Sequence, residues 1–229
     1  MQPRAHRSSR ASTERDVDET PQSVRAARAE YLHELLFRSG TPVFALLDAA
    51  RDPGVVKLLE TGDCPYTCLY AGHSGEIYKP YAPYLAQVAK GSRVLDTLLR
   101  KGWGQSVGYF IGSRSEPGEL LTHLRKFLFV DLPGKERRAY FRFYDPRVMR
   151  AFLPTCSDEQ LDDWLREHLE WFVIEAEEGA WARVFVRTTP ERREAQGVSD
   201  RLVLTPIQLP VVPASQDEMA HAPDSRIAV

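Results

Sequence analysis

Residues 43–62 read VFALLDAARDPGVVKLLETG, and they contain a strand signal followed directly by a helix signal. The first part, 43–50, is a short continuous apolar run, which is typical of a buried strand. The second part, 52–62, has apolar residues at helical spacing and ends at Gly62, a residue type that commonly terminates helices. A strand that passes directly into a helix is the building unit of α/β proteins.

The same order of strand and helix signals recurs along the chain. Helix signals cover 22–39, 92–101 and 115–128, and strand signals cover 65–72, 82–89 and 106–113. Ser92 and Ser115 suit the N-cap positions of their helices, because a serine hydroxyl accepts a hydrogen bond from a free backbone N–H. Residues 73–80 are expected to form a loop. The alternation predicts an α/β fold in which flanking helices cover a mixed central sheet, with part of that sheet parallel.

A dense aromatic stretch, AYFRFY at residues 139–144, predicts a further strand. Side chains alternate between the two faces of a strand, so the stretch has one apolar and one amphipathic face. The apolar face is expected to join the core and consists of Ala139, Phe141 and Phe143. The amphipathic face consists of Tyr140, Arg142 and Tyr144. Together with Arg147, the amphipathic face is a candidate partner-binding surface.

The next residues predict a fixed corner between this strand and a helix. Asp145 suits the N-cap, and Pro146 suits the first helical position, where its missing N–H costs nothing. The helix is expected to end before Pro154. The simplest role for Arg142 and Arg147 is to pair with acidic side chains and brace this corner, while the tyrosines cover the edge of the core.

The C-terminal part of the body predicts a helix followed by a hairpin. SDEQ at 157–160 is a capping box, with serine at the N-cap and glutamine three residues later. Residues 171–188 predict two strands with a turn near Glu178-Gly179. We therefore expect a C-terminal helix-hairpin subdomain that closes a body spanning 22–187.

The two ends of the chain differ from this body. Residues 1–21 are polar and predict a disordered leader, whereas residues 188–229 form a proline-rich tail. The segment 201–213 is apolar but interrupted by prolines, so it cannot be a central strand and is expected to run extended along the body or a partner. Few core positions are expected in the tail, so the body should fold without it.

Charge is distributed unevenly within a net charge of −2. Residues 135–150 hold six Lys/Arg and two acids, whereas residues 157–178 hold nine acids and one arginine. Two adjacent patches of opposite sign can pair with each other or offer two docking faces, although solvated surface is the simpler interpretation. The acids that we consider for partner binding are Glu175, Glu177 and Glu178.

Composition excludes several classes of protein. The small net charge provides no global basic field for nucleic acid. Three cysteines argue against a disulfide framework, and no apolar run approaches the roughly 20 residues that span a bilayer. The N-terminal residues have no apolar segment of a secretory signal. We expect a cytoplasmic protein that binds neither nucleic acid nor membrane.

The motifs for chemistry are weak. Cys64, Cys68 and His73 supply too few ligands, at unsuitable spacing, for a structural zinc site. GWGQSVG at 102–108 is one residue too long for a dinucleotide fingerprint and precedes a strand instead of following one. We therefore expect no catalytic centre, no metal and no cofactor.

Two other functions remain open. Asp48, Asp52 and Asp63 lie near strand-to-helix junctions, where active sites often form, so a hydrolase could use an acid such as Asp48 in a cleft there. Alternatively, Tyr140, Arg142 and Tyr144 could stack on the bases of single-stranded RNA. Acids at such junctions are more often turn formers, and the signature glycines of the RNA-binding module are absent.

Seven blocks of this sequence resemble the adaptor, or effector-chaperone, domain of bacterial type VI secretion systems, a domain long catalogued only as one of unknown function. The blocks are FALLDAARDP (44–53), CLYAG (68–72), APYL (82–85), GWG (102–104), GYFIGS (108–113), HLRKFL (123–128) and FRFYDPRVMRAFLP (141–154). Asp48 and Trp103 lie within these blocks as structural residues. The resemblance is clear over 43–154 and fades towards residue 187.

The resemblance implies a role without catalysis. Members of the family bind a toxic effector in the cytoplasm and help to load it onto the valine-glycine repeat spike protein (VgrG). The residues that match the most characteristic block are Tyr140, Arg142, Tyr144, Asp145, Pro146 and Arg147. After Cys156 the chain departs from the family pattern, so the resemblance does not name the effector.

Overall fold

The structure is a computed structural model that describes residues 20–131, 137–188 and 202–210. The leader expected at 1–21 lies outside these residues except for its last two positions, and so does most of the tail expected at 188–229. Within the described part of the chain, no helix is long and apolar enough to cross a membrane.

The core of the fold is a seven-stranded sheet with the order β2-β3-β1-β4-β7-β8-β9. Its strands are β1 (Val43–Asp48), β2 (Tyr66–Cys68), β3 (Pro83–Val88), β4 (Gly108–Gly112), β7 (Trp171–Ala176), β8 (Trp181–Arg187) and β9 (Leu202–Gln208). The predicted α/β class is confirmed. The expectation of parallel pairing is wrong, because every pairing between the described strands is antiparallel.

The order of the strands explains this difference. Strands β1 and β2 run in the same direction and are joined through a helix, as the alternation of signals indicates, but β3 inserts between them and pairs with both. In the same way, β1 inserts between β3 and β4. Each strand–helix–strand unit is therefore split by an antiparallel neighbour. The local sequence pattern indicates that a helix connects two strands, but it does not indicate which other strand lies between them in the sheet.

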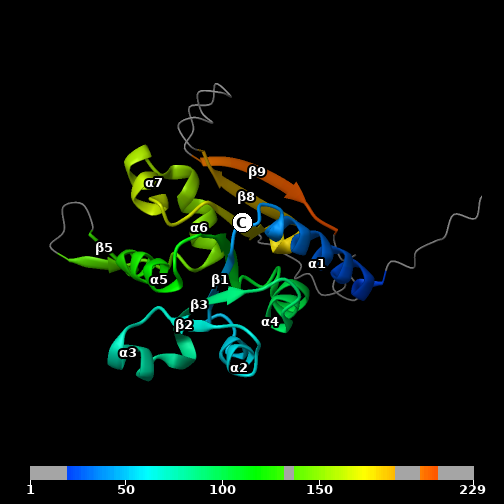
Figure 1. Ribbon diagram of the computed structural model, residues 1–229, viewed down its shortest axis with the longest axis horizontal. Coiled ribbons are helices and arrows are strands. Elements are labelled where there is room, and N and C mark those ends of the chain that lie inside the picture. The colour runs from blue at the N-terminus through cyan, green and yellow to red at the C-terminus, as the bar shows by residue number, and fades with distance from the viewer. Residues whose placement is uncertain (1–19, 132–136, 189–201, 211–229) are drawn as a thin grey trace, which may run out of the picture.

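Helices cover both faces of the sheet (Figure 1). They are α1 (Pro21–Phe37), α2 (Gly54–Glu60), α3 (Gly72–Ile77), α4 (Arg93–Thr97), α5 (Pro117–Arg125), α6 (Pro146–Phe152) and α7 (Asp158–Leu165). Short helical turns are η1 (Lys79–Tyr81), η2 (Leu98–Gly102), η3 (Lys126–Leu128), η4 (Leu153–Thr155) and η5 (Glu177–Gly179). Helix α3 lies where the sequence predicts a loop.

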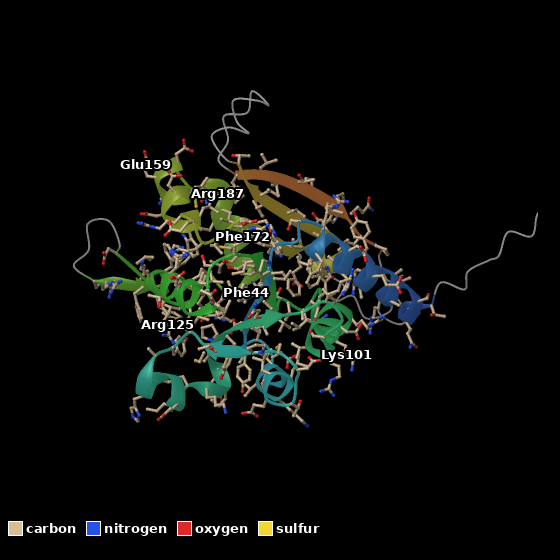
Figure 2. All side chains as sticks on the ribbon, in the orientation of Figure 1. Phe44, Lys101, Arg125, Glu159, Phe172 and Arg187 are labelled. Atoms are coloured by element: carbon tan, nitrogen blue, oxygen red, sulfur yellow. The ribbon has the colours of Figure 1, made fainter. Side chains whose placement is uncertain are left out.

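The two faces of the sheet build two hydrophobic clusters. In β1, Val43, Ala45 and Leu47 pack in the cluster that includes α1, α2 and α4. Phe44 and Leu46 pack in the cluster that includes α5, α6 and α7. Figure 2 shows Phe44 and Phe172 inside the molecule, among the elements of the second cluster. Burial on both faces explains why the β1 sequence is continuously apolar.

Local capping signals are largely confirmed. Ser92 caps α4, and Ser157 and Gln160 form the complete capping box of α7. Asp145 caps α6 with Pro146 at its first position. The prediction for Ser115 is wrong, since α5 begins at Pro117 after Glu116 and the Ser115 hydroxyl lies 2.9 Å from Nδ1 of His168.

The aromatic stretch 139–144 is not one strand. Strand β6 (Arg138–Tyr140) ends at Tyr140 and pairs with β5 (Phe129–Asp131) in a separate two-stranded sheet, called the ribbon below. The chain then turns inward, so the neighbouring residues Phe143 and Tyr144 are both buried. The expectation that Tyr144 lies on an amphipathic surface is wrong, because a turn interrupts the alternation of faces.

The predicted extended segment in the tail forms β9, the edge strand that pairs with β8. Leu209, directly after it, is buried in the core. Strands β7 and β8 pair across the turn at Glu177–Gly179, and both belong to the main sheet instead of a separate unit. The body therefore includes a strand from beyond residue 187.

Candidate partner-binding site

The residues of the characteristic block gather around two buried carboxylates. Asp48, at the end of β1, is fully buried, and its Oδ1 accepts a hydrogen bond from the backbone N–H of Ala50 at 3.0 Å. Its Oδ2 accepts a hydrogen bond from Nη2 of Arg142 at 2.5 Å. A buried charge needs such a partner, so this ion pair holds the chain after β6 against the sheet.

The second carboxylate belongs to Asp145. Its side chain is buried, accepts a hydrogen bond from the backbone N–H of Arg147 at 2.9 Å, and pairs with Nη2 of the same arginine at 2.6 Å. Burial opposes ionisation, but the hydrogen bonds from Arg147 outweigh it and lower the pKa of Asp145. The interpretation of Arg142 and Arg147 as braces of the corner is confirmed.

Three phenols form a chain beside this corner. The hydroxyl of Tyr140 lies 2.8 Å from that of Tyr144 and also hydrogen-bonds to that of Tyr70. Burial, followed by these hydrogen bonds, raises the pKa of Tyr140 well above its ordinary value, so the phenol stays neutral. Tyr70 follows β2, so its hydrogen bond to Tyr140 joins two segments that are 70 residues apart in the chain. Tyr144 is the buried end of the chain, whereas Tyr140 is partly exposed.

An open apolar groove of about 560 Å³ lies beside Tyr70 and Tyr140, the two members of this chain that are less buried than Tyr144. We call it the aromatic groove, and its lining residues are Leu69, Tyr70, Ala71, Tyr78, Tyr81, Arg125, Leu128, Phe129 and Tyr140. Of the seven large apolar side chains that are exposed in the described part of the chain, four line this groove. A concentration of exposed apolar surface of this kind marks interaction sites.

Ring contacts make the groove a continuous surface. Tyr70 contacts Tyr78 edge-on with ring centroids 6.4 Å apart, and it contacts Tyr140 at 6.3 Å. Tyr140 in turn contacts Phe129 across the ribbon at 5.4 Å. The sequence patterns did not indicate Tyr78, Tyr81 or Phe129 as site residues. The aromatic spacing in YKPYAPY (78–84) is the one local signal that could have indicated them.

Arg125 supports the wall of the groove from α5. Its Nε donates to the carbonyl of Leu69 at 2.9 Å, and its Nη2 donates to the carbonyl of Cys68 at 3.0 Å. Figure 2 shows Arg125 at the end of α5 that faces the α3 region. Among the described residues that line the groove, it is the one charged residue. The groove therefore combines an apolar surface with the fixed cation of Arg125.

The acidic residues are not equivalent. Glu175 is buried, so the expectation that it meets a partner is wrong. Its carboxylate accepts hydrogen bonds from the backbone N–H groups of Gly104 at 2.5 Å and Ser106 at 2.6 Å. Strand β7 is buried on both faces. The alternation of Glu175 and Glu177 along the sequence does not reveal this burial. Glu177 and Glu178 are exposed in the turn after β7 and stay candidates for partner binding.

Trp103 has a structural role in the same region. Its indole N–H donates to the carbonyl of Gly179 at 3.1 Å, and Gly104 approaches the backbone of Glu178 too closely for a side chain. Trp103 thus ties the loop after η2 to the turn between β7 and β8. This agrees with its place among the structural residues of the sequence blocks.

The register of the sheet places these features at one end. Asp48 pairs with Pro83 and Leu47 with Gly108, while Ala176 pairs with Trp181 across the next hairpin. Strands β1 and β7 therefore finish, and strands β3, β4 and β8 begin, at the same end of the sheet. The corner at Asp145-Pro146, the aromatic groove and the turn with Glu177 and Glu178 are all built from segments next to this end.

The positions of these residues bear on the two alternative functions, a hydrolase that uses Asp48 and a protein that binds single-stranded RNA. The carboxylate of Asp48 is fully buried and already accepts two hydrogen bonds, so it does not face a substrate. Arg142 pairs with Asp48 and Tyr144 is buried, so the three side chains proposed for RNA stacking do not share an exposed face. Across the described residues, no group of three or more His, Cys, Asp or Glu side chains is placed to hold a metal ion.

Comparison with known proteins gives one match. No curated protein and no solved structure matches the chain. One family model matches residues 43–163, which is more than half of the chain and includes the corner, the lining residues of the aromatic groove and the first part of α7. On this match, the chain belongs to the family described as Domain of unknown function (DUF4123).

Proposed function

We propose that this protein is a cytoplasmic adaptor and chaperone that binds a type VI secretion effector and helps to load it onto the VgrG spike. The observation that carries the proposal is the aromatic groove, where apolar side chains that could have been buried lie open in one continuous surface. The blocks between 43 and 154 resemble the adaptor domain, and this resemblance supports an effector and the spike as the partners.

The mechanism is binding without chemistry. An apolar segment of the effector would cover the groove, which removes apolar surface from water on both partners. The braced corner keeps one wall rigid, because Arg142 and Arg147 are each tied to a buried carboxylate. A preformed surface loses little freedom on binding, and this favours affinity. The spike would bind a second surface, so that the effector is presented while it stays soluble.

Co-expression tests this proposal. The effector encoded beside this gene is produced with and without the full chain, and its soluble fraction is measured. Tagged adaptor is then used to retain the effector and the spike. We expect the effector to aggregate when it is produced alone and to be retained when it is co-expressed. An unrelated toxin of similar size serves as the control and should not be retained. An effector that is equally soluble alone, with neither protein retained, contradicts the proposal.

A further inference from the structure

The aromatic groove has a shape that selects among types of partner. One wall comes from the segment around η1, which carries Tyr78 and Tyr81, and the other from the ribbon, which carries Phe129 and Tyr140. Apart from Arg125, the described residues that line the groove are aromatic or aliphatic. The outer carbonyl of Phe129 already accepts a hydrogen bond from Nη2 of Arg138 at 2.9 Å.

These walls argue against the addition of a strand. A peptide that extends a sheet needs a row of free backbone donors and acceptors, and its affinity comes from main-chain hydrogen bonds. A surface of side chains instead accepts the apolar face of a helix, whose anchors recur at positions i, i+3 or i+4 and i+7. A volume of about 560 Å³ is within the range of roughly 300–1,000 Å³ typical of binding pockets, so it holds a few large side chains and not a whole helix.

Charge specifies the partner further. Arg125 is the one charged residue in the part of the lining that the structure describes, and Arg138 lies over the ring of Phe129 with its guanidinium carbon 5.7 Å from the centroid. Oδ1 of Asp131 pairs with Nε of Arg138 at 3.5 Å. A carboxylate among the anchors of the partner would meet the Arg125 cation in a partly apolar setting, where ion pairs are stronger than in water.

We propose that the aromatic groove binds an amphipathic helix of the effector, which presents two or three large apolar side chains and one carboxylate towards Arg125. This inference rests on the proposed function, because it names the part of the effector that an adaptor would hold. The apolar anchors fill the space between Tyr78, Tyr81 and Phe129, and the carboxylate sets the register of the helix.

Site-specific photocrosslinking tests the location. The photoreactive residue p-benzoyl-phenylalanine replaces Tyr81 in the full chain, and in a matched control it replaces Tyr31 on α1. Both tyrosines are exposed, at 62% and 46%, but Tyr31 does not line the groove. We expect irradiation of the co-purified complex to join the effector to position 81 and not to position 31. Crosslinking equally from both positions, to the spike, or to a second copy of this chain would overturn the inference.

Affinity measurements test the chemistry. Synthetic peptides that tile the effector are the probes, and the binding peptide is compared with the Tyr78→Ser/Tyr81→Ser variant and with Tyr31→Ser as the control. Truncation of an anchor contact typically weakens binding about tenfold or more. We expect that loss for the groove variant and none for the control, with unchanged melting temperatures because these side chains are exposed. Replacing the acidic residue of the peptide with its amide should weaken binding several-fold.

The outcomes separate the two proposals. If the wild-type chain retains the effector but the groove variant binds it equally well, the groove inference fails and the adaptor function stands. If no tiled peptide binds while the whole effector does, the helix assignment is wrong. If the wild-type chain retains neither the effector nor the spike, the adaptor function fails, and the inference fails with it.

Discussion

The carboxylate of Asp48 and the guanidinium of Arg142, which are 94 positions apart in the chain, form an ion pair in which the carboxylate is fully buried. This pair joins the end of β1 to the segment that follows β6. Arg142→Met would leave the carboxylate buried without its cation, and we expect a loss of about 1–3 kcal/mol in the free energy of unfolding. The side chain of Arg142 is partly exposed, which keeps the loss below that of a fully buried pair.

A double-mutant cycle checks the pairing. Asp48→Asn keeps an oxygen that accepts from Ala50 but removes the charge. The double variant Asp48→Asn/Arg142→Met should therefore be more stable than the sum of the two single losses predicts, as urea denaturation would show. Strict additivity would mean that the two residues do not interact.

The acids of the β7 segment should respond differently to charge reversal. Glu175→Lys would place a cation in a buried site that holds two backbone N–H donors, so we expect a loss of more than about 3 kcal/mol or failure to fold. Glu177→Lys and Glu178→Lys change exposed side chains and should alter stability by less than about 0.5 kcal/mol. Thermal unfolding of the three variants measures this difference, and equal melting temperatures would contradict the buried position of Glu175.

His123 makes stability depend on pH. Its Nε2 donates to the carbonyl of Trp164 at 2.8 Å, and its buried Nδ1 has no hydrogen-bond partner among the described residues. Burial lowers the pKa of His123 below 6.5; the hydrogen bond to Trp164 opposes this shift, and the charges of His168, Lys126 and Arg166 add to it. The folded state therefore binds its proton less readily than the unfolded state. The contribution of neutral His123 to the free energy of unfolding is therefore expected to be fully present above pH 6.5. It should decrease as the pH falls from there through the lowered pKa.

This sign can be measured by thermal unfolding between about pH 8 and pH 5. The melting temperature of the wild-type chain should fall on the acid side, and His123→Gln should reduce that fall because glutamine can still donate to Trp164 without titrating. His73 is exposed, so His73→Gln serves as the control and should leave the profile unchanged. Identical profiles for wild type and His123→Gln would rule out His123 as the cause.

Removal of the segment after β8 should destabilise the body. A chain that ends at Thr188 lacks β9 and Leu209, so it loses a strand pairing and exposes apolar side chains that pack on β8. We expect a loss of at least about 2 kcal/mol, together with aggregation through the newly exposed edge. A chain that ends at Pro210 keeps β9 and is the matched control. Equal melting temperatures for both truncations would show that the body folds without β9, as the sequence alone suggests.

Pro206 lies in β9, the last strand of the main sheet within the described residues. The N–H of Leu209 donates to the carbonyl of Ala180, and N–H directions alternate along an antiparallel strand, so the nitrogen of Pro206 faces away from β8. Proline removes a donor there that could pair with another chain. Pro206→Thr should increase self-association in light scattering as concentration rises, whereas Thr205→Val should not. A monodisperse Pro206→Thr variant would contradict this role.

Local signals in the sequence were sufficient for most of the elements. The caps at Ser92, Asp145 and Ser157 were identified because an N-cap depends on three or four neighbouring residues. Short apolar runs and a turn signal located the strands of the main sheet for a similar reason, except β9, which was expected only as an extended segment. The turn after Tyr140 was missed, because the burial of Phe143 and Tyr144 depends on helices and strands that are distant in sequence.

By itself, the sequence determined the class of the fold, the starts of α4, α6 and α7, the corner at Asp145-Pro146 and the resemblance that suggests an adaptor. The tertiary structure decided which strand lies between β1 and β2, which acid is buried, and that β9 completes the sheet. It alone assembled the aromatic groove, whose walls come from residues 69–81, 125–129 and 140. Local structure depends on interactions within a few residues, whereas strand order, burial and grooves depend on contacts between segments that the chain brings together only when it folds.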